Sequence, residues 1–553
     1  MTEPTTESRS PRRFDRSSGV GGYGFRVTVL GICAFAAGLR LARLGSEGLW
    51  NDECATAIWA RLPGPELLAA LRVDNHAPLF FFLERAVTAV LGYGEAALRL
   101  LPALAGIATV GLAAVVGARI VSRRAGLLAA LLLAISPLHL HYSQEAKSYA
   151  LQMLLALAVF GLAHRLHETR STRVALVLGL VAALDLYTHN VGLFVVGGVF
   201  VAYVAFERGW QGYRPWLLAG ATALLAYLPW LGILLRQASV GDASYAWLAS
   251  SWRAEFPWQI LRSLAALSHG SLPPVRNHVT QLGWNAWIGL GIALLLAAAG
   301  LAVRRRWALR DAALRLPIAV VLPLAGLFVY SIVFTPVYVV GRVDAAVLPL
   351  LVILIASGTE AMRPRLRALV PLAFIGLAIL PLELLMRVDH RSQERTITAS
   401  LREAFRPGDV LVSTGFNGCL RHYLEVEADA GLLMFPSQLE QHPEWIDWSQ
   451  YDETRLVADA EAVSTAAGAA LRRRSGRSIC LISRDEAREA PIARALAGRL
   501  QAAEAYDLRY LGYRLRRYER ARLTTFPQNA PRVRVMSPTP SGPDSGRTRR
   551  GLP

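Results

Sequence analysis

Two adjacent carboxylates, Asp52 and Glu53, lie in the polar segment LWNDECAT, residues 49–56, just after the first membrane-length apolar run. Ionisable groups beside membrane segments are functional-site hypotheses by default, because they are costly there without a role. A structural role fits the same pattern, since Asn51 or Asp52 can open the following helix by accepting hydrogen bonds from its free N–H groups. Catalysis and N-capping are compatible, and both hypotheses stay open at this point.

Two further segments combine side chains that carry charge or protons. DNHAPL, residues 74–79, sets His76 shortly before a proline that opens the next helix, so we expect the imidazole beside a positive helix end. SPLHLHYSQEAKSYAL, residues 136–151, packs two His, two Tyr, Glu145 and the single lysine of the chain, Lys147, between two apolar runs. The alternative for this segment is a solvated loop in which Lys147 extends to the membrane surface.

The composition identifies the class of protein. Of the 553 residues, 53% are hydrophobic and 18% are charged, and the mean hydropathy is +0.34, which is typical of a polytopic membrane protein. The net charge of +18 lies mainly on arginines in short loops and in the two tails, as expected of cytoplasmic segments that face anionic lipid. This distribution argues against nucleic acid as a partner.

The arginine clusters predict the direction of each span. Residues 1–22 form a polar, disordered tail whose arginines hold the N-terminus in the cytoplasm, so Asp52 is expected on the outer face. Residues 78–93 are short and carry central charges that cost roughly 2.5 to 3.5 kcal/mol each to insert, which predicts an outer surface helix. The other apolar runs predict about eleven spans: 25–44, 98–120, 125–138, 150–166, 174–187, 191–206, 216–235, 284–303, 317–334, 341–357 and 368–386.

This topology gathers the polar residues of the apolar region on the outer face, while the basic loops fall on the inner one. The outer group comprises Asp52, Glu53, Asp74, Asn75, His76, His139, His141, Gln144, Glu145, Lys147, His189, Tyr338 and Arg342. A concentration of ionisable groups on one face predicts a functional site there.

The composition changes after residue 386 to that of a soluble domain. Residues 409–415 and 478–483 predict buried strands, and residues 459–472 and 491–505 predict helices, so we expect residues 387–524 to form a small extracytoplasmic α/β domain. In that compartment Cys419 and Cys480 are candidates for a disulfide. Residues 525–553 are rich in Pro, Ser and Arg, which predicts a disordered tail.

Together the three polar segments resemble the polyprenyl-phosphate-sugar-dependent membrane glycosyltransferases, namely the protein O-mannosyltransferases and their bacterial relatives, including the lipid A aminoarabinose transferase. In that group a WxDE-like motif closes the first span, and an H/K-x-P-L motif, an R-L-P stretch and an SP…YSQEAR.YAL-like motif follow. Here the third is Arg99-Leu100-Leu101-Pro102, and Lys147 stands where Arg is commoner. The resemblance covers about residues 25–360 and implies a mainly α, GT-C-like bundle, residues 23–386, with juxtamembrane helices over the outer face.

The resemblance also implies an activity. A monosaccharide, mannose or similar, would move with inversion from a polyprenyl-phosphate donor to a hydroxyl of a protein, lipid or polysaccharide acceptor, at the outer face of the inner (plasma) membrane. Asp52 would be the general base and Glu53 would position it, while Glu145 would orient the acceptor or hold a divalent cation with Glu53.

The donor phosphate needs positive charge, which His76, Lys147 and Arg342 would supply. Arg342 follows the turn TPVYVVG, where it is also interpretable as a simple interfacial anchor. Further substrate-binding candidates are Asp74, Asn75, Tyr142, Gln144 and His189.

Two other classes of protein compete with a transferase. A transporter or flippase of the lipid-linked sugar should place ionisable groups near the bilayer midplane in two repeated halves. A non-catalytic scaffold for envelope assembly should leave Asp52 and Glu145 far apart without a cleft. The sequence names neither the sugar nor the acceptor.

Overall fold

The structure, a computed structural model, describes residues 19–244, 258–269, 283–306, 310–334 and 336–387, and parts of residues 395–519. The predicted C-terminal tail lies outside the described residues, as does the N-terminal tail up to residue 18.

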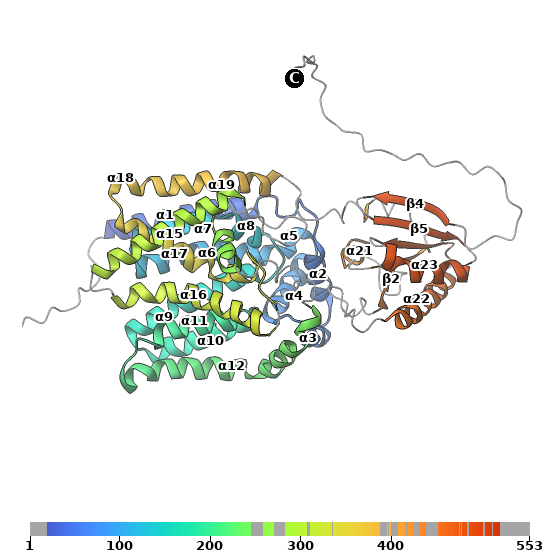
Figure 1. The fold of residues 1–553 in the computed structure, drawn as a ribbon, viewed down its shortest axis with the longest axis horizontal. Coiled ribbons are helices and arrows are strands. Elements are labelled where there is room, and N and C mark those ends of the chain that lie inside the picture. Colours follow the sequence, from blue (N-terminus) through green and yellow to red (C-terminus); the bar gives the residue numbers. More distant parts are fainter. Residues whose placement is uncertain are drawn as a thin grey trace, which may run out of the picture.

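Each of the eleven predicted spans coincides with a helix, and Figure 1 shows these helices running side by side as one bundle. They are α1 (Gly19–Leu41), α6 (Leu100–Ile120), α7 (Arg123–Ile135), α9 (Tyr149–Thr169), α10 (Thr172–Thr188), α11 (Gly192–Val204), α12 (Gly209–Ser244), α15 (Trp284–Arg306), α16 (Arg310–Val333), α17 (Leu348–Gly358) and α19 (Leu369–Arg387). Shorter helices join them: α8 (Pro137–Ser143), α14 (Gln259–Ala266), η2 (Val343–Val347), η3 (Thr359–Ala361) and α18 (Pro364–Arg367).

Within the described residues, seven helices are long and apolar enough to cross a membrane, or eight if one bent pair counts as a single span. Shorter apolar helices occur at Gly192–Val204 and Trp284–Gly300. The chain is therefore a multi-pass membrane protein, as its composition predicts.

The bent pair is α7 and α8, which meet at 64°. The side chain of Ser136 accepts a hydrogen bond from the backbone N–H of His139, and the proline that follows Ser136 begins the second helix. The carbonyls of Leu133 and Ala134, at the end of α7, accept hydrogen bonds from the buried guanidinium of Arg40. The break therefore changes the chain direction at the start of the 136–151 segment. The sequence had predicted a span followed by an outer loop at this point.

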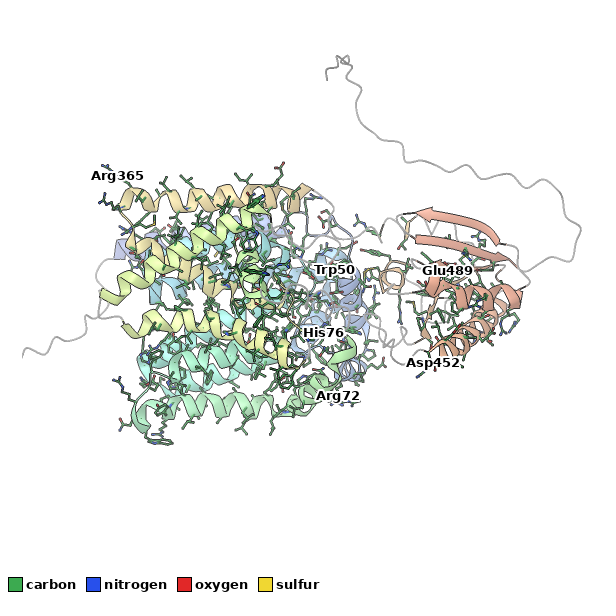
Figure 2. The ribbon with its side chains drawn as sticks, in the orientation of Figure 1. Trp50, Arg72, His76, Arg365, Asp452 and Glu489 are labelled. Atoms are coloured by element: carbon green, nitrogen blue, oxygen red, sulfur yellow. A yellow bond between two sulfur atoms is a disulfide. The ribbon has the colours of Figure 1, made fainter. Side chains whose placement is uncertain are left out.

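Four short helices cover one end of the bundle: α2 (Asn51–Arg61), α3 (Gly64–Val73), α4 (Leu79–Leu91) and α5 (Glu95–Leu98). We call this end the α2 end. Helix α4 corresponds to the predicted surface helix and is not among the candidate spans. In Figure 2, Trp50 and His76 lie at the α2 end, whereas Arg365, from a loop predicted to be cytoplasmic, lies at the opposite end. The polar and basic loops therefore separate as the arginine distribution predicts.

The C-terminal domain faces the α2 end (Figure 1). Its sheet has the order β2-β1-β3-β5-β4, in which β1 pairs in parallel with β2 and β3, and β5 pairs antiparallel with β3 and β4. The strands are β1 (Val410–Thr414), β2 (Leu432–Phe435), β3 (Ser478–Ser483), β4 (Glu504–Tyr510) and β5 (Tyr513–Glu519). The helices are α21 (Gly418–Leu424), α22 (Glu453–Arg473) and α23 (Glu486–Leu500).

The two strands predicted from sequence are β1 and β3, and the two predicted helices are α22 and α23. The boundary at residue 505 is wrong, because α23 ends at Leu500 and a strand begins at Glu504. An apolar core between sheet and helices includes Val412, Leu481 and Leu496. Every residue of β1 and β3 is buried, which agrees with the prediction of buried strands from two short apolar runs.

A disulfide joins the two parts of the chain. It links Cys54 on α2 with Cys419 on α21 across a sequence separation of 365 residues. The predicted pair Cys419–Cys480 is wrong, because Cys480 is a free cysteine buried in β3, whereas α21 packs against α2. The cross-link fixes the C-terminal domain to the helix that carries the acidic pair.

Replacing Cys54 and Cys419 together with serine should loosen the C-terminal domain from the α2 end. A disulfide typically contributes about 2 to 4 kcal/mol by restricting unfolded conformations. We expect trypsin to release the C-terminal domain faster from the double variant than from the parent protein in detergent, with Cys33→Ser as the control for a free cysteine. Equal cleavage rates, or peptide mass spectra without the Cys54–Cys419 link, would contradict this assignment.

Candidate active site

Asp52 lies in the first turn of α2 and forms an ion pair with Arg342, whose Nη2 is 2.7 Å from Oδ2 of Asp52. Nε of Arg342 donates a hydrogen bond of 2.5 Å to the hydroxyl of Tyr149. The rings of Trp50 and Tyr149 lie 5.9 and 5.6 Å from the guanidinium carbon. The side chains of Asp52 and Arg342 remain 16% and 20% exposed, so solvent reaches the pair.

A turn fixed by the bundle positions Arg342. Gly341 has a φ of 74°, in the left-handed region that favours glycine. Its carbonyl accepts a hydrogen bond of 2.5 Å from the buried hydroxyl of Tyr142, and its N–H donates to Oδ2 of Asp344 over 3.0 Å. Tyr142 therefore acts on the turn that presents Arg342.

Glu53, the neighbour of Asp52, is fully buried and forms an ion pair with Arg99. Nε and Nη2 of Arg99 donate to its two carboxylate oxygens over 2.8 and 2.7 Å, and the backbone N–H of Ala146 donates over 2.9 Å. Arg99 also donates to three backbone carbonyls, those of Leu44, Glu47 and Gly48. Glu53 therefore ties α2 to the polar 136–151 segment.

Neither Asn51 nor Asp52 is the N-cap of α2, so that interpretation is wrong in detail. The helix begins at Asn51 itself, so its N-cap is Trp50. The backbone N–H of Trp50 donates to the carboxylate of Glu53 over 3.3 Å. The structural role considered for Asp52 thus belongs to Glu53, and Asp52 takes a different partner.

The 136–151 segment is no solvated loop, because residues 136–150 are all buried. Nε2 of Gln144 donates to the carbonyls at the end of α1, from Leu39, Arg40 and Ala42. Glu145 is 2% exposed and lies 3.4 Å from Nε2 of His141. The segment is packed inside the protein and contacts the Asp52–Arg342 pair through Tyr149.

The DNHAPL segment forms the next wall of the site. Nδ1 of His76 lies 2.9 Å from Oδ1 of Asp74, and Asp74 is buried. Burial alone would raise the pKa of Asp74, but the hydrogen bond and charge of His76 outweigh it and hold the pKa below its ordinary value. The carbonyl of Asn75 accepts a hydrogen bond of 3.1 Å from the side chain of Asn190.

Lys147 reaches the same wall from the other side. Its Nζ lies 5.8 Å from the ring centres of both Trp59 and Phe81, and the ring of His76 lies 5.3 Å from each of these two rings. Cation–π contacts of this kind hold an ammonium group that is otherwise costly to bury. Lys147 and His76 therefore share one aromatic cradle.

His189 lies where the cationic groups converge. Its ring is 5.6 Å from that of Tyr149, and its Nδ1 accepts a hydrogen bond of 3.1 Å from the backbone N–H of Val191. Burial, followed by the nearby charges of His76, Arg342 and Lys147, lowers the pKa of His189 to about 3. Burial disfavours a charge of either sign, whereas the three nearby positive groups favour an anion over a cation.

A divalent cation bridging Glu53 and Glu145 does not fit these contacts, because both oxygens of Glu53 already accept hydrogen bonds from Arg99. The described residues form no group of three or more His, Cys, Asp or Glu side chains arranged for a metal ion. We assign no chemical step to a metal.

Several residues of this site were not assigned a role from the sequence. Arg99 was noted only as part of a motif, and Tyr149 and Trp59 were not singled out at all. The family resemblance included Arg99 in its set of motifs, but its partner among the two carboxylates is set by packing between segments 46 residues apart.

Comparisons with known proteins extend this picture. Residues 75–233 match the family model for dolichyl-phosphate-mannose-protein mannosyltransferases. The structure superposes on ArnT from Cupriavidus metallidurans in the apo state with a TM-score of 0.55 and 15% sequence identity, covering 90% of this chain and 98% of that one. The chain has the fold of ArnT.

The ArnT structure bound to undecaprenyl phosphate gives the same TM-score of 0.55 at 15% identity, covering 92% of this chain and all of that one. The apo oligosaccharyltransferase of Archaeoglobus fulgidus matches with a TM-score of 0.51 and 12% identity over 84% of this chain and 70% of that one. No curated protein matches the chain significantly. The family model thus matches one part of the chain, and the likeness to ArnT shows its fold.

Proposed function

We propose that the protein transfers a monosaccharide from a polyprenyl-phosphate donor to an acceptor hydroxyl at the α2 end, on the outer face of the plasma membrane. The observation that carries this proposal is the accessible Asp52–Arg342 pair, set beside the cationic groups that converge on His189. It combines a carboxylate that can accept a proton with positive charge for a phosphate.

The donor phosphate fits the side of the site that carries positive charge. Arg342 has a planar guanidinium suited to bidentate phosphate contacts, and Lys147 and His76 add charge from the aromatic cradle. The undecaprenyl phosphate in the ArnT complex is a ligand of this class. We propose that these three residues hold the leaving phosphate and neutralise its developing charge.

The acceptor fits the side of the site that carries Asp52. In one inverting displacement the acceptor oxygen forms a bond to the anomeric carbon while the bond from that carbon to the phosphate oxygen breaks. The hydroxyl proton passes to Asp52, and the polyprenyl phosphate leaves with the bonding electron pair. Arg342 contacts Asp52 directly and places its positive charge between the base and the phosphate.

The roles of the two other carboxylates differ from that of Asp52. Glu53 and Glu145 are 0% and 2% exposed, and Glu53 is held by Arg99. We propose that Glu53 positions α2, and through it Asp52. Glu145 acts on Arg342 and Tyr149 through its charge.

The direct test supplies membranes that contain the protein with radiolabelled polyprenyl-phosphate-mannose, and then with other sugar-lipids, followed by identification of the labelled product. Protein-dependent transfer to a protein, lipid or polysaccharide is the expected result. Movement of the labelled lipid between leaflets without any product would instead indicate a flippase.

Substituting Arg342 separates its charge from its geometry. Arg342→Lys keeps the charge but cannot donate at once to Asp52, Tyr149 and a phosphate, so we expect the transfer rate to fall about 10²-fold to 10³-fold, and further in Arg342→Gln. Initial rates at varied donor concentration measure the effect, with Arg365→Lys at the opposite end as the control. A near-normal rate in Arg342→Gln would support the interfacial-anchor interpretation.

A further inference from the structure

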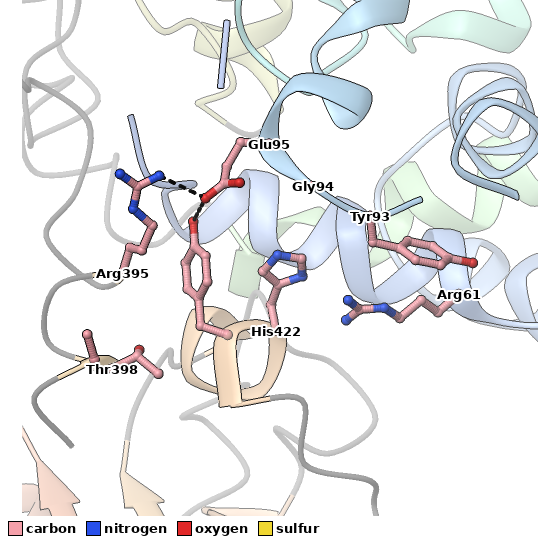
Figure 3. Close-up of a pocket in the computed structure, with 9 residues that line it drawn as sticks. Arg61, Tyr93, Gly94, Glu95, Arg395, Thr398 and His422 are labelled. Carbon is pink, nitrogen blue, oxygen red and sulfur yellow. Dashed lines mark hydrogen bonds and ion pairs between the residues drawn. The ribbon is translucent and has the colours of Figure 1, made fainter. Parts of the chain in front are cut away.

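A cavity lies between the α2 end and the C-terminal domain, with a volume of about 560 Å³. Figure 3 shows the side chains that line it, among them Arg61, Tyr93, Glu95, Arg395, His422 and Tyr423. Its volume lies in the range of small-molecule sites, about 300 to 1,000 Å³. It shares no lining residue with the Asp52–Arg342 site.

The elements around the cavity belong to both parts of the chain. Arg61 is the last residue of α2, Glu95 the first of α5, and His422 and Tyr423 come from α21. The disulfide between α2 and α21 holds these walls together. The cavity therefore exists only when the C-terminal domain is docked.

A charged and hydroxyl-bearing wall closes one side of the cavity. Oε1 of Glu95 accepts a hydrogen bond of 3.2 Å from Arg395 and one of 3.1 Å from the hydroxyl of Tyr423, as the dashed lines in Figure 3 show. The Tyr423 hydroxyl in turn accepts a hydrogen bond of 2.6 Å from the backbone N–H of Leu49. On the opposite side the guanidinium of Arg61 lies 4.7 Å from the centre of the Tyr93 ring.

His422 is a buried side chain of this cavity whose hydrogen-bonding capacity is not fully used. It is 6% exposed, and its Nδ1 has no hydrogen-bond partner in the described part of the chain. Burial, with the charge of Arg61 adding to it, lowers the pKa of His422 to about 4, so the ring is neutral at physiological pH. A neutral imidazole has one donor and one acceptor, and leaving either buried and unmet costs about 1 to 3 kcal/mol.

We propose that this cavity binds sugar residues of the acceptor, and that the acceptor is therefore a glycan longer than one sugar. Sugar hydroxyls both donate and accept, which suits His422, Tyr423 and the Glu95–Arg395 pair together. The ring of Tyr93 supplies an aromatic surface of the kind that packs against apolar faces. This inference rests on the proposed transferase function and specifies its acceptor.

The position of the cavity suits a remote subsite. Arg61 and Asp52 stand nine residues apart on α2, which corresponds to about 14 Å along the helix at 1.5 Å per residue. A sugar bound beside His422 is thus too distant to react but near enough to belong to the same chain as a reacting hydroxyl. Binding energy from such a remote unit serves to orient the reacting end.

Saturation-transfer NMR on the purified full-length protein in detergent tests the proposal. The probes are three neutral trisaccharides, of mannose, arabinose and glucose, and inorganic phosphate is added as a competitor because it has no carbon-bound protons to observe. We expect at least one trisaccharide to bind and its Kd to rise about fivefold to tenfold in His422→Phe, which keeps the ring volume but removes both nitrogens. Arg72→Ala, at an exposed arginine of α3 outside the cavity, is the matched control and should bind normally.

Asp52→Asn keeps the two proposals separable. If the cavity is a glycan subsite, this variant loses transfer but binds the trisaccharide as the parent protein does. Failure of all three trisaccharides to bind, binding that His422→Phe leaves unchanged, or displacement of a bound trisaccharide by phosphate would overturn the subsite. None of these results would affect the donor assay. An unfolded His422→Phe is recognised by loss of its Cys54–Cys419 link, and Tyr93→Ala then replaces it with the same expected loss.

Discussion

Asp52→Asn is expected to reduce sugar transfer by about 10²-fold to 10⁴-fold, the usual contribution of a general base. Asparagine keeps the size of the side chain and can still contact Arg342, but it cannot take the proton of the acceptor hydroxyl. Because the side chain is 16% exposed and does not cap α2, the change should leave folding intact. Transfer from radiolabelled polyprenyl-phosphate-mannose, normalised to protein in the membrane, measures the loss.

Two controls make that result specific. Asp52→Glu retains a carboxylate displaced by one methylene and should keep part of the activity. Donor binding should persist in Asp52→Asn, since the phosphate contacts are assigned to other residues, so kcat should fall more than KM rises. Transfer at the parental rate in Asp52→Asn would remove Asp52 from the role of base, whatever else the site does.

The sequence was sufficient to predict which residues gather at one end of the bundle. Short basic loops alternate with apolar runs, and this alternation alone placed Asp52, His76 and Arg342 on a common face. The structure has Asp52 and Arg342 in contact although they stand 290 residues apart. Hydropathy and charge are properties of each segment by itself, which explains why the sequence was enough to predict this common face.

The sequence could not predict which residues form ion pairs with Asp52 and Glu53. Asp52 and Glu53 are adjacent and chemically alike, yet one is accessible beside Arg342 and the other is sealed against Arg99. Successive residues of a helix point about 100° apart, so neighbours face different surroundings, and these are created by distant segments. The Cys54–Cys419 disulfide could not be predicted for the same reason, since only the docking of α21 on α2 brings those cysteines together.

The bend between α7 and α8 is another feature that the hydropathy pattern did not predict. An apolar run followed by polar residues predicted a span and an exposed loop, but Ser136 and the next residue start a new buried helix. The polar residues are tolerated inside where they contact nearby backbone and side chains, as Gln144 contacts the end of α1. A buried polar segment and a solvated loop can have the same composition, and only the three-dimensional contacts distinguish them.

Breaking the Glu53–Arg99 pair should have the largest effect on stability. Removing one partner of a buried ion pair leaves the other charge without compensation and costs about 3 to 5 kcal/mol. Arg99 here also holds the carbonyls of Leu44, Glu47 and Gly48, so Arg99→Met should lose the connection from α1 to α2 as well. Thermal unfolding in detergent, followed by tryptophan fluorescence, should show a lower Tm for Glu53→Leu and for Arg99→Met.

The double variant Glu53→Leu with Arg99→Met distinguishes a structural pair from a catalytic one. With both charges removed the desolvation penalty disappears, so stability should recover relative to either single change. If Glu53 acts only by holding α2, transfer should recover together with stability, because Asp52 regains its place beside Arg342. Recovered stability without recovered transfer would mean that Glu53 contributes to the chemistry itself, and the division of labour between the two carboxylates would be wrong.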